Sequence, residues 1–283
     1  MKRNMRIYRV LQGRKCNTEN PELFTEKIQL YKFHFKHPDL YRITDKVQFK
    51  SYITEKLGEG HVIPMYGAWD NIDDLEKEWF SENSVIPEEF VLKQNLQSMG
   101  RCIKFIHHKS EVDFAELKKE IAGWLDVENT QYNSVARHLI GGKPMLLAEQ
   151  FNANFKDQLF DYKLFCFNGK PYCVYTAQDH FGEDGSHISF YDMDWNRIDV
   201  QYGQHKVGDI PCPKHFEEMK AYAAKLSEGF PFVRVDFFDT DDKLFLAEMT
   251  FVPGGGFTPY NPISFDKQMG DLFILPDDCL PKK

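Results

Sequence analysis

The sequence lacks several features that would assign it to a class at once. None of its 6 cysteines forms a C-x-x-C pair, which disfavours zinc ribbons and thioredoxin-like redox sites and favours reduced, buried thiols. No apolar run approaches the roughly 20 residues that a transmembrane helix needs, and none follows the basic N-terminus as in a signal peptide. We therefore expect a soluble, cytoplasmic protein with no membrane span.

An excess of basic residues is also absent. The chain has 35 Lys and Arg against 43 Asp and Glu, which gives a formal net charge of −8. Such a surface repels phosphate backbones as a whole, so nucleic acid is not an expected partner. The 283 residues are 42% hydrophobic and include 25 Phe. This composition supplies enough material for one or two packed units and excludes disorder as the main state.

The apolar pattern predicts helices in the first third of the chain and mostly strands from residue 90 onward. Asp45 is a suitable N-cap for a helix that Gly58 ends, and a capping box of Ser110 and Asp113 begins another helix. Asn168-Gly169 predicts the turn of a hairpin. The expected strands cover 61–66, 90–93, 102–106, 145–151, 161–167, 171–176, 232–238 and 244–251, and a further helix covers 216–226.

Two acidic residues are notable on the last two expected strands. Because side chains alternate along a strand, Asp236 shares a face with Arg234, and Glu248 shares a face with Thr250. The short turn between the strands brings Asp236 and Glu248 together. Paired carboxylates on an apolar hairpin repel each other unless a cation joins them, and hard oxygen ligands suit Mg²⁺, above all Mg²⁺ that carries nucleotide phosphates. An edge hairpin with both carboxylates in solvent fits the pattern equally well.

A lysine at the end of an expected strand is a candidate phosphate ligand. Lys93 precedes a polar loop, 94–101, that contains Gly100 and Arg101. A cation beside flexible backbone suits phosphate oxygens. A hairpin with an exposed lysine fits this pattern too, because the loop has a single glycine.

Six segments in this order resemble the ATP-grasp superfamily. They are Thr44-Asp45-Lys46, Phe90-Val91-Leu92-Lys93, Leu147-Ala148-Glu149, Asp161-Tyr162-Lys163, Arg234-Val235-Asp236 and Glu248-Met249-Thr250. Three further sets resemble the branch typified by the teichuronopeptide biosynthesis proteins of bacterial polysaccharide clusters. These are Asn20-Pro21 with Glu26-Lys27-Ile28, Asp161-Tyr162-Lys163 with 167–171, and 248–251 with 253–257. The resemblance covers residues 18–275 and implies an α+β fold, in which two α/β subdomains grip a nucleotide between antiparallel sheets, with a mostly helical N-terminal region.

The resemblance also implies roles for particular residues. Those assigned to the nucleotide are Lys46, Lys93, Gly100, Glu149, Gln150, Phe151, Asp161 and Lys163. The first two would hold phosphates beneath a flap at 94–101, the group 149–151 would receive the adenine, and the last two would bind ribose and phosphate. Those assigned to Mg²⁺ are Asp236, Glu248 and Thr250. Arg234, together with Lys163, would act on the reacting carboxylate or acyl phosphate.

The implied reaction joins a carboxylate to an amine with ATP and Mg²⁺. The expected substrates are small molecules, an amino acid and a uronic acid, sugar nucleotide or other cell-surface polysaccharide precursor. The implied regions are an N-terminal region at 1–88, a flap subdomain at 89–151 and a metal-binding subdomain at 152–283. Oligomeric state is not indicated.

Three alternatives stay open from the sequence. A kinase of the same fold would leave the phosphoryl group on its substrate, and a degenerate relative would only bind or act as a scaffold. Asp192-Met193-Asp194 matches the D-x-D pattern of sugar-nucleotide glycosyltransferases, although a solvated turn is the favoured interpretation of so short a match. Two departures from the family concern Thr250, where many relatives have asparagine, and Gln178-Asp179-His180, where many have arginine. The first leaves the number of metal ions open.

Overall fold

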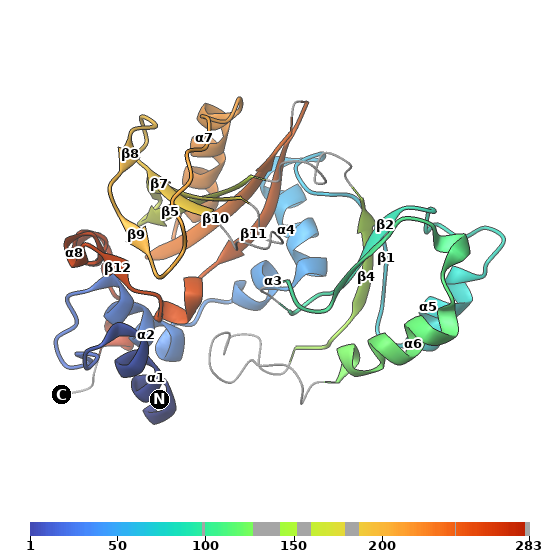
Figure 1. Cartoon of the computed structure of the whole chain (residues 1–283), viewed down its shortest axis with the longest axis horizontal. Helices are drawn as coiled ribbons and strands as arrows, with labels where there is room; N and C mark the ends of the chain where they lie inside the picture. The colour runs from blue at the N-terminus through green and yellow to red at the C-terminus, as the bar shows by residue number, and fades with distance from the viewer. Residues whose placement is uncertain (98–99, 127–141, 152–159, 179–186, 241, 281–283) are drawn as a thin grey trace. The chain divides into compact units, whose positions relative to one another are not determined.

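The computed structural model describes residues 1–97, 100–126, 142–151, 160–178, 187–240 and 242–280 (Figure 1). The chain divides into two compact units. The large unit comprises Met1–Pro38 and Asn154–Lys283, and the small unit comprises Asp39–Tyr132 and Leu139–Ala153. Residues 1–38 thus group with the C-terminal part, whereas the sequence led us to expect one region over 1–88. Within the described residues, no helix is both long enough and apolar enough to cross a bilayer.

The small unit is an antiparallel sheet with helices. Its strands are β1 (Met65–Trp69), β2 (Phe90–Gln94), β3 (Ile103–Ile106) and β4 (Leu146–Gln150), in the order β1-β4-β2-β3. Its helices are α3 (Leu40–Thr44), α4 (Lys46–Leu57), α5 (Ile72–Trp79), η1 (Lys109–Glu111), α6 (Phe114–Ile121) and η2 (Ala122–Leu125). Burial of large side chains such as Leu75, Trp79, Phe90 and Phe114 in one cluster supplies its core.

Side-chain caps determine where two of these helices begin. Asp45 accepts bonds from the Val47 and Gln48 amides at 2.9 and 3.1 Å, which confirms the expected N-cap of α4. Asp113, rather than Ser110, is the cap of α6. The expected capping box is wrong because the amide and hydroxyl of Ser110 both donate to Glu88.

The strand expected at 61–66 is displaced toward its C-terminal end. It pairs with β4 only from Met65 onward, where Met65 lies opposite Glu149. The preceding carbonyls have other partners. That of Ile63 accepts a bond from Lys50, and that of Pro64 accepts one from the Gln150 amide.

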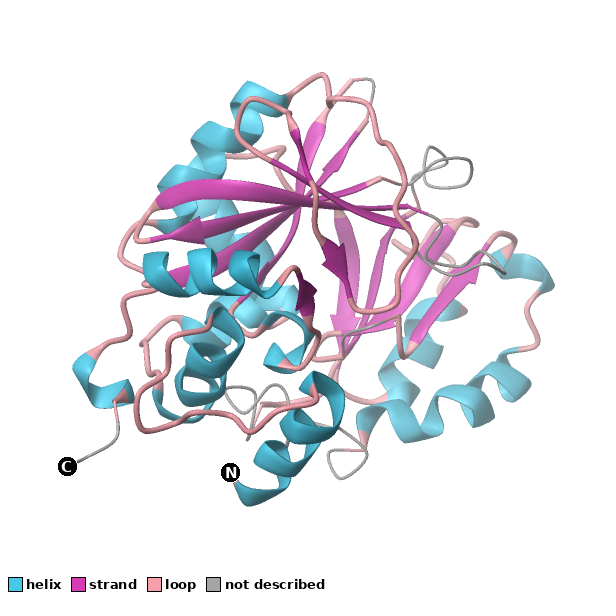
Figure 2. Cartoon of the chain, turned by 60° about the vertical axis from the view of Figure 1, so that its left-hand side comes forward, coloured by secondary structure: helices cyan, strands magenta, loops and turns pink. Residues whose placement is uncertain are grey.

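The large unit contains a second antiparallel sheet, whose strands are among those drawn in magenta in Figure 2. Its strand order is β11-β10-β5-β6-β7-β8. Its strands are β5 (Asp161–Phe167), β6 (Lys170–Gln178), β7 (His187–Tyr191), β8 (Arg197–Ile198), β10 (Phe232–Asp239) and β11 (Leu244–Thr250), and a separate pair is formed by β9 (Gln201–Tyr202) and β12 (Tyr260–Asn261). The helices are α1 (Lys2–Gln12), α2 (Phe24–His34), α7 (Phe216–Ser227), η6 (Pro253–Gly256), α8 (Ile263–Leu272) and η7 (Asp277–Cys279). Asn168 and Gly169 have φ of 51° and 78° and connect β5 to β6, which confirms the predicted hairpin.

The two faces of the large sheet have different coverings. Helix α7 packs on β5, β6 and β10, and Ser227 at the end of that helix lies near the side chain of Cys166 of β5. On the opposite face, the ring of Phe24 in α2 lies 6.0 Å from Phe165 and 4.8 Å from Phe232. Strand alternation places Lys163 and Asp236 on this second face as well. One end of the face is therefore an aromatic core beneath α2, and the other end is charged.

Candidate functional site

Charged side chains form a row across three adjacent strands of the large unit. Asp236 of β10 lies opposite Lys163 of β5 on one side and opposite Glu248 of β11 on the other. In the next row, Arg234 lies opposite Thr250. The predicted closeness of Asp236 and Glu248 is confirmed.

A β-bulge in β11 makes this row compatible with an apolar core. Asp236 pairs with Glu248, but the next residue of β10, Phe237, pairs with Leu246, so Ala247 is the extra residue. A bulge of one residue reverses which face the following side chains occupy. Leu246 is therefore buried on the same side as Phe237, while Glu248 stays on the charged face.

Arg234 bonds to both members of the acidic pair and to Thr250. Its Nε donates to Asp236 Oδ1 at 2.7 Å, and its Nη2 donates to Asp236 Oδ2 at 2.5 Å. The same Nη2 lies 3.3 Å from Glu248 Oε1 and 3.1 Å from Thr250 Oγ1. The Thr250 hydroxyl in turn donates to Glu248 Oε1 at 3.0 Å. A planar guanidinium suits such forked contacts better than an ammonium does.

Lys163 completes the cluster from β5. Its Nζ donates to Asp161 Oδ2 at 2.8 Å and to Asp236 Oδ2 at 3.3 Å. The side chain of Asp236 is only 1% exposed, whereas that of Glu248 is 42% exposed. The cluster is thus buried at Asp236 and open to solvent at Glu248.

The charges of this cluster shift one another's pKa values. Burial alone would lower the pKa of Lys163 and of Arg234, but the neighbouring carboxylates outweigh it and raise both. Burial raises the pKa of Asp236, although Arg234 and Lys163 oppose that shift. The cations are therefore firmly charged, and the buried carboxylate would be stabilised by additional positive charge.

A second charged cluster lies in the small unit, around a buried carboxylate of β4. The two oxygens of Glu149 are each bound by a lysine: Oε1 lies 2.6 Å from Lys50 Nζ, and Oε2 forms an ion pair with Lys93. Burial alone would raise the pKa of Glu149, but the two ammonium groups outweigh it and lower the pKa. Burial lowers the pKa of Lys50 despite the attraction of Glu149.

Lys50 is a member of this cluster that the sequence analysis missed. It lies in α4, four residues after Lys46, and its ammonium also donates to the Ile63 carbonyl at 2.6 Å. Residues four apart share one face of a helix. That spacing was a signal that could have identified Lys50 together with Lys46.

Lys46 lies at the base of the expected flap. Its ammonium donates to the carbonyls of Asn95 and Gln97, which follow β2. The side chain of Asn95 is fixed in turn, since its Nδ2 donates to Asp45 Oδ2 at 2.7 Å. Gly100 has φ of 68°, as a turn requires, and residues 98–99 of the expected flap lie outside the described residues.

The segment expected to receive adenine has partners of its own. The Gln150 amide donates to the Pro64 carbonyl at 2.9 Å. The Phe151 ring lies 5.2 Å from the His107 ring and 6.1 Å from the Phe105 ring, edge to face. The adenine role of residues 149–151 stays a prediction, and the Gln150 amide is engaged in the sheet.

Comparison with known protein families identifies the family of this chain. A profile of the TupA-like ATP-grasp family matches residues 26–274. The chain belongs to the TupA-like ATP-grasp family. The resemblance inferred from six short segments is confirmed, and the α+β architecture with antiparallel sheets is that of an ATP-grasp fold.

Solved structures with a similar arrangement are distant in sequence. D-alanine–D-alanine ligase from Helicobacter pylori aligns with a TM-score of 0.46 and 12% identity over 82% of this chain and 61% of that chain. The ATP complex of the Bacillus anthracis enzyme gives a TM-score of 0.42 and 15% identity over 75% and 56%. N5-carboxyaminoimidazole ribonucleotide synthetase from Thermus thermophilus gives 0.40 and 13% over 74% and 45%. This ATP-grasp chain spans less than two thirds of each of these proteins. No curated protein matches it in sequence.

The charged row of this ATP-grasp protein fits a magnesium ion that arrives with a nucleotide. Within the described ranges, no group of three or more His, Cys, Asp or Glu could hold a metal ion. Asp236 and Glu248, with the hydroxyl of Thr250, supply only part of an oxygen shell. Mg²⁺ in nucleotide sites is typically bound by one or two carboxylates together with phosphate oxygens and waters, which is the complement that this donor set needs.

The D-x-D segment has a structural task. Asp192 Oδ1 accepts bonds from the amides of Asp194 and Asn196 at 2.9 and 2.8 Å. The following Trp195 has φ of 62° and stacks on Tyr191, with ring centroids 4.4 Å apart. The carboxylate of Asp192 thus closes its own turn, as expected for a solvated turn.

The segment 178–180, where many relatives have arginine, is described only in part. Gln178 ends β6, and Asp179 and His180 lie outside the described residues.

Proposed function

We propose that this ATP-grasp protein is an ATP-dependent carboxylate–amine ligase that forms an amide through an acyl phosphate. Membership of the family supports ATP-dependent chemistry. The observation that carries the proposal further is the row Lys163–Asp236–Glu248 with Arg234 beside it. Such a row sets two carboxylates for a metal next to two cations for anionic oxygens. That is the electrostatic pattern that phosphoryl transfer to a carboxylate needs.

The assignment of roles follows the charges. Lys46 and Lys93 would bind nucleotide phosphates, beneath the flap with Gly100. Asp236, Glu248 and Thr250 would hold Mg²⁺, which when bound would neutralise phosphate oxygens and orient them. Within the described cluster, Asp161, Asp236 and Glu248 carry three negative charges against two on Lys163 and Arg234, so the cluster retains one net negative charge for a cation.

Further residues take roles on the nucleotide and the reacting groups. Asp161 would bind the ribose, and residues 149–151 would receive the adenine. Arg234 and Lys163 would stabilise negative charge on the reacting carboxylate and on the acyl phosphate. Their raised pKa values keep both groups charged throughout the working pH range.

The reaction balances in two steps. One oxygen of the substrate carboxylate bonds to the γ-phosphorus of ATP, and ADP leaves. The amine nitrogen then bonds to the acyl carbon, the bond from that carbon to the phosphate oxygen breaks, and the nitrogen loses a proton to water. The amide, ADP and inorganic phosphate are the products. Holding the groups in register and excluding water from the acyl phosphate are the protein's main contributions.

For the substrates, we propose an amino acid as the amine and a uronic acid, or a related precursor of a cell-surface polysaccharide, as the acid. The family resemblance to teichuronopeptide biosynthesis proteins of bacteria supports this choice. Because the reaction consumes ATP, the proposed location is the cytoplasm, upstream of the cell envelope. The loop at 254–256 is a candidate for binding the substrate carboxylate through the backbone amides of Gly254 and Gly256, since the Gly255 amide donates to the Val252 carbonyl at 3.1 Å.

A product screen tests this function. The protein would be incubated with Mg-ATP, uronic acids or nucleotide-linked uronates, and amino acids, with ADP and phosphate measured and products identified by mass spectrometry. We expect ADP only when both an acid and an amine are present, together with a product whose mass is their sum less water. A phosphorylated product without free phosphate would establish a kinase, and release of UDP without any need for ATP would establish a glycosyltransferase. Either result would overturn the proposal.

A further inference from the structure

Side chains of the N-terminal helices α1 and α2 hold the loop after β11 by donating hydrogen bonds to its backbone carbonyls. The carbonyls of three consecutive residues, Gly255, Gly256 and Phe257, accept side-chain hydrogen bonds. Gln29 Nε2 donates to the first two at 3.0 and 2.9 Å. Lys32 Nζ donates to Gly255 at 2.7 Å, and Gln12 Nε2 donates to Phe257 at 3.1 Å. Residues of α1 and α2 thus determine which way the backbone of this loop faces.

The glycines of the loop are required by this arrangement. Gly254, Gly255 and Gly256 have φ of 55°, 64° and 67°, a conformation that favours glycine. A Cβ on Gly256 would lie 2.5 Å from Gln29 Nε2 and 2.5 Å from Ile28 Cγ2. Close approach of α2 to the loop therefore excludes any side chain at position 256.

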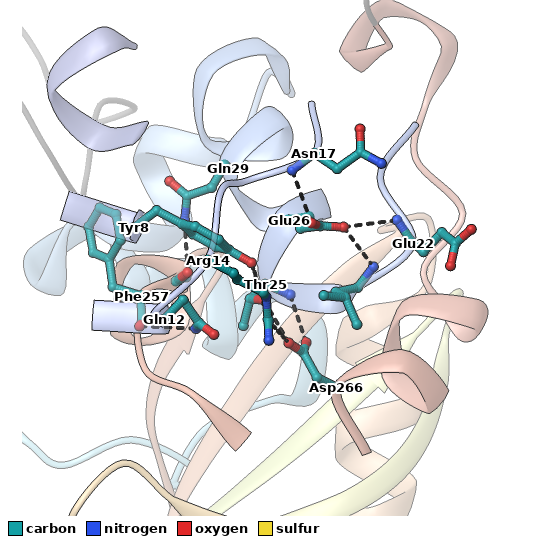
Figure 3. Close-up of polar contacts among 12 residues, drawn as sticks. Tyr8, Gln12, Arg14, Asn17, Glu22, Thr25, Glu26, Gln29, Phe257 and Asp266 are labelled. Carbon is teal, nitrogen blue, oxygen red and sulfur yellow. Dashed lines mark hydrogen bonds and ion pairs between the residues drawn. The ribbon is translucent and has the colours of Figure 1, made fainter. Parts of the chain in front are cut away.

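The N-terminal segment is itself anchored to α8 in the same unit (Figure 3). Asp266 accepts bonds from the Thr25 amide at 2.9 Å and the Thr25 hydroxyl at 2.7 Å. Arg14 Nη2 forms an ion pair with Asp266 Oδ2 at 3.1 Å. Glu26 accepts the backbone amides of Asn17, Glu22 and Leu23. This network fixes α2, and α2 then fixes the loop.

Two features show that the bonds to the loop come at a cost in stability. The amide oxygens of Gln12 and Gln29 are buried without a hydrogen-bond partner in the described part of the chain. Lys32 is 6% exposed, and within the described residues its ammonium has no carboxylate at ion-pair distance; it lies 4.1 Å from the centre of the Phe257 ring. Buried groups that lack a hydrogen-bond partner or a counter-charge are destabilising, and a role in function is one reason why a native fold keeps them.

We propose that Gln29 and Lys32 are positioning residues that set the loop 254–257 for binding the substrate carboxylate. The loop begins four residues after Thr250, the last member of the charged row, so it follows directly from that end of β11. With the carbonyls of residues 255–257 turned toward α2, and the amides of Gly255 and Phe257 bonded to the Val252 and Gly254 carbonyls, Gly254 is the exposed residue that the loop offers to a ligand. This inference rests on the proposed function for the identity of that ligand.

Matched substitutions on α2 separate this role from a general effect on folding. Lys32→Met and Gln29→Met each remove donors to the loop and keep an unbranched side chain. Lys27→Met is the control, because Lys27 lies on the same helix and its ammonium also donates to two carbonyls, those of Gly270 and Phe273 at 2.8 and 2.9 Å. All three variants lose bonds from α2 to backbone, but the control leaves the loop untouched.

Hydrogen exchange of the peptide 252–258 is the first measurement, because it needs no substrate. Loss of the Lys32 bond, or of the two Gln29 bonds, should speed exchange of this peptide about tenfold or more in Lys32→Met and Gln29→Met, and the control should match the wild type there. Unchanged exchange in both loop variants would overturn the positioning role. So would equal acceleration in the control.

The second measurement uses the acid and amine found in the product screen. We expect KM for the acid to rise about tenfold or more in both loop variants, while KM for Mg-ATP changes by less than about twofold. Faster exchange with an unchanged KM for the acid would overturn the substrate role. If no acid supports turnover by the wild type, the proposed function fails, and the exchange experiment still decides whether Gln29 and Lys32 position the loop.

Discussion

Asp236 and Glu248 face each other on adjacent antiparallel strands, and a single guanidinium, that of Arg234, bonds to both carboxylates. Arg234 therefore keeps these two carboxylates close together, while Lys163 pairs Asp236 with Asp161. Direct hydrogen bonds among these side chains fix their relative positions.

Replacing Asp236 with asparagine should separate chemistry from packing. The amide keeps the volume but removes the charge that Arg234 and Lys163 share, so turnover should fall about 100-fold or more, and the free energy of unfolding should fall by about 3 kcal/mol. Steady-state rates below the melting temperature measure the loss of turnover, and denaturant titration measures the loss of stability. The control is Asp194→Asn, an exposed residue of the same unit, which should leave both unchanged. Turnover of Asp236→Asn within about threefold of the wild type would contradict the metal role.

Substitutions of the two lysines that pair with Glu149 should have different effects on Mg-ATP affinity and on stability. Lys93→Met should weaken Mg-ATP binding about tenfold or more, because an ammonium proposed to face phosphate is lost. Lys50→Met should chiefly lower the free energy of unfolding, by about 1–3 kcal/mol, since the ammonium of Lys50 is committed to Glu149 and to the Ile63 carbonyl. Calorimetric titration measures the affinity for Mg-ATP, and denaturant unfolding measures the free energy of unfolding. Equal losses of affinity in the two variants would show that the assignment of Lys93 is wrong.

The stability contributed at Lys32 should depend on pH. Burial lowers the pKa of Lys32 from 10.5 to about 7. Between those values the unfolded chain binds more protons than the folded chain, so the contribution of Lys32 to the free energy of unfolding rises with pH; below pH 7 both states are protonated, and the burial penalty is constant. The difference between wild type and Lys32→Met should rise by up to about 1.4 kcal/mol per pH unit above neutrality. Urea titrations from pH 6 to 9 measure it, and a flat difference would show that the buried amine keeps its ordinary pKa.

Two glycines with nearly equal φ should respond differently to alanine. Gly13 has φ of 68°, and a Cβ placed on it would have nothing within 4 Å, whereas a Cβ on Gly256, at φ of 67°, would meet Ile28 and Gln29. Gly13→Ala should therefore cost only backbone strain, about 1 kcal/mol, and Gly256→Ala should cost about 3 kcal/mol because the side-chain clash is added. Denaturant unfolding distinguishes them. Equal costs would mean that α2 does not press on the loop.

Features that depend on local chemistry could be predicted from the sequence. The Asp45 cap, the Asn168-Gly169 turn and the shared face of Asp236 and Glu248 all follow from residues that are close in the chain or joined by a short turn. The order of six segments was enough to indicate the family. These predictions succeeded because each depends on a conformational preference that tertiary contacts reinforce.

Features that depend on distant contacts could not be predicted. The bond from Gln29 to the Gly256 carbonyl joins residues 227 positions apart, and no local pattern marks it. The extra residue Ala247 in β11 is visible only once β10 and β11 are in register. The ion pairs of the Glu149 carboxylate with Lys50 and Lys93 join three separate segments of the chain and were not predicted either. Burial decided these contacts, and burial is set by the whole fold.

The path of one oxygen atom tests the central claim most directly. With the acid labelled by a heavy oxygen isotope in its carboxylate, an acyl phosphate intermediate must transfer one labelled oxygen to the inorganic phosphate when the amine displaces it. The account predicts phosphate that carries one labelled oxygen and is formed in equal amount with ADP and amide. In Asp236→Asn, labelled phosphate should form only at the residual rate of turnover. Unlabelled phosphate, or label retained in a stable phosphorylated product, would contradict it.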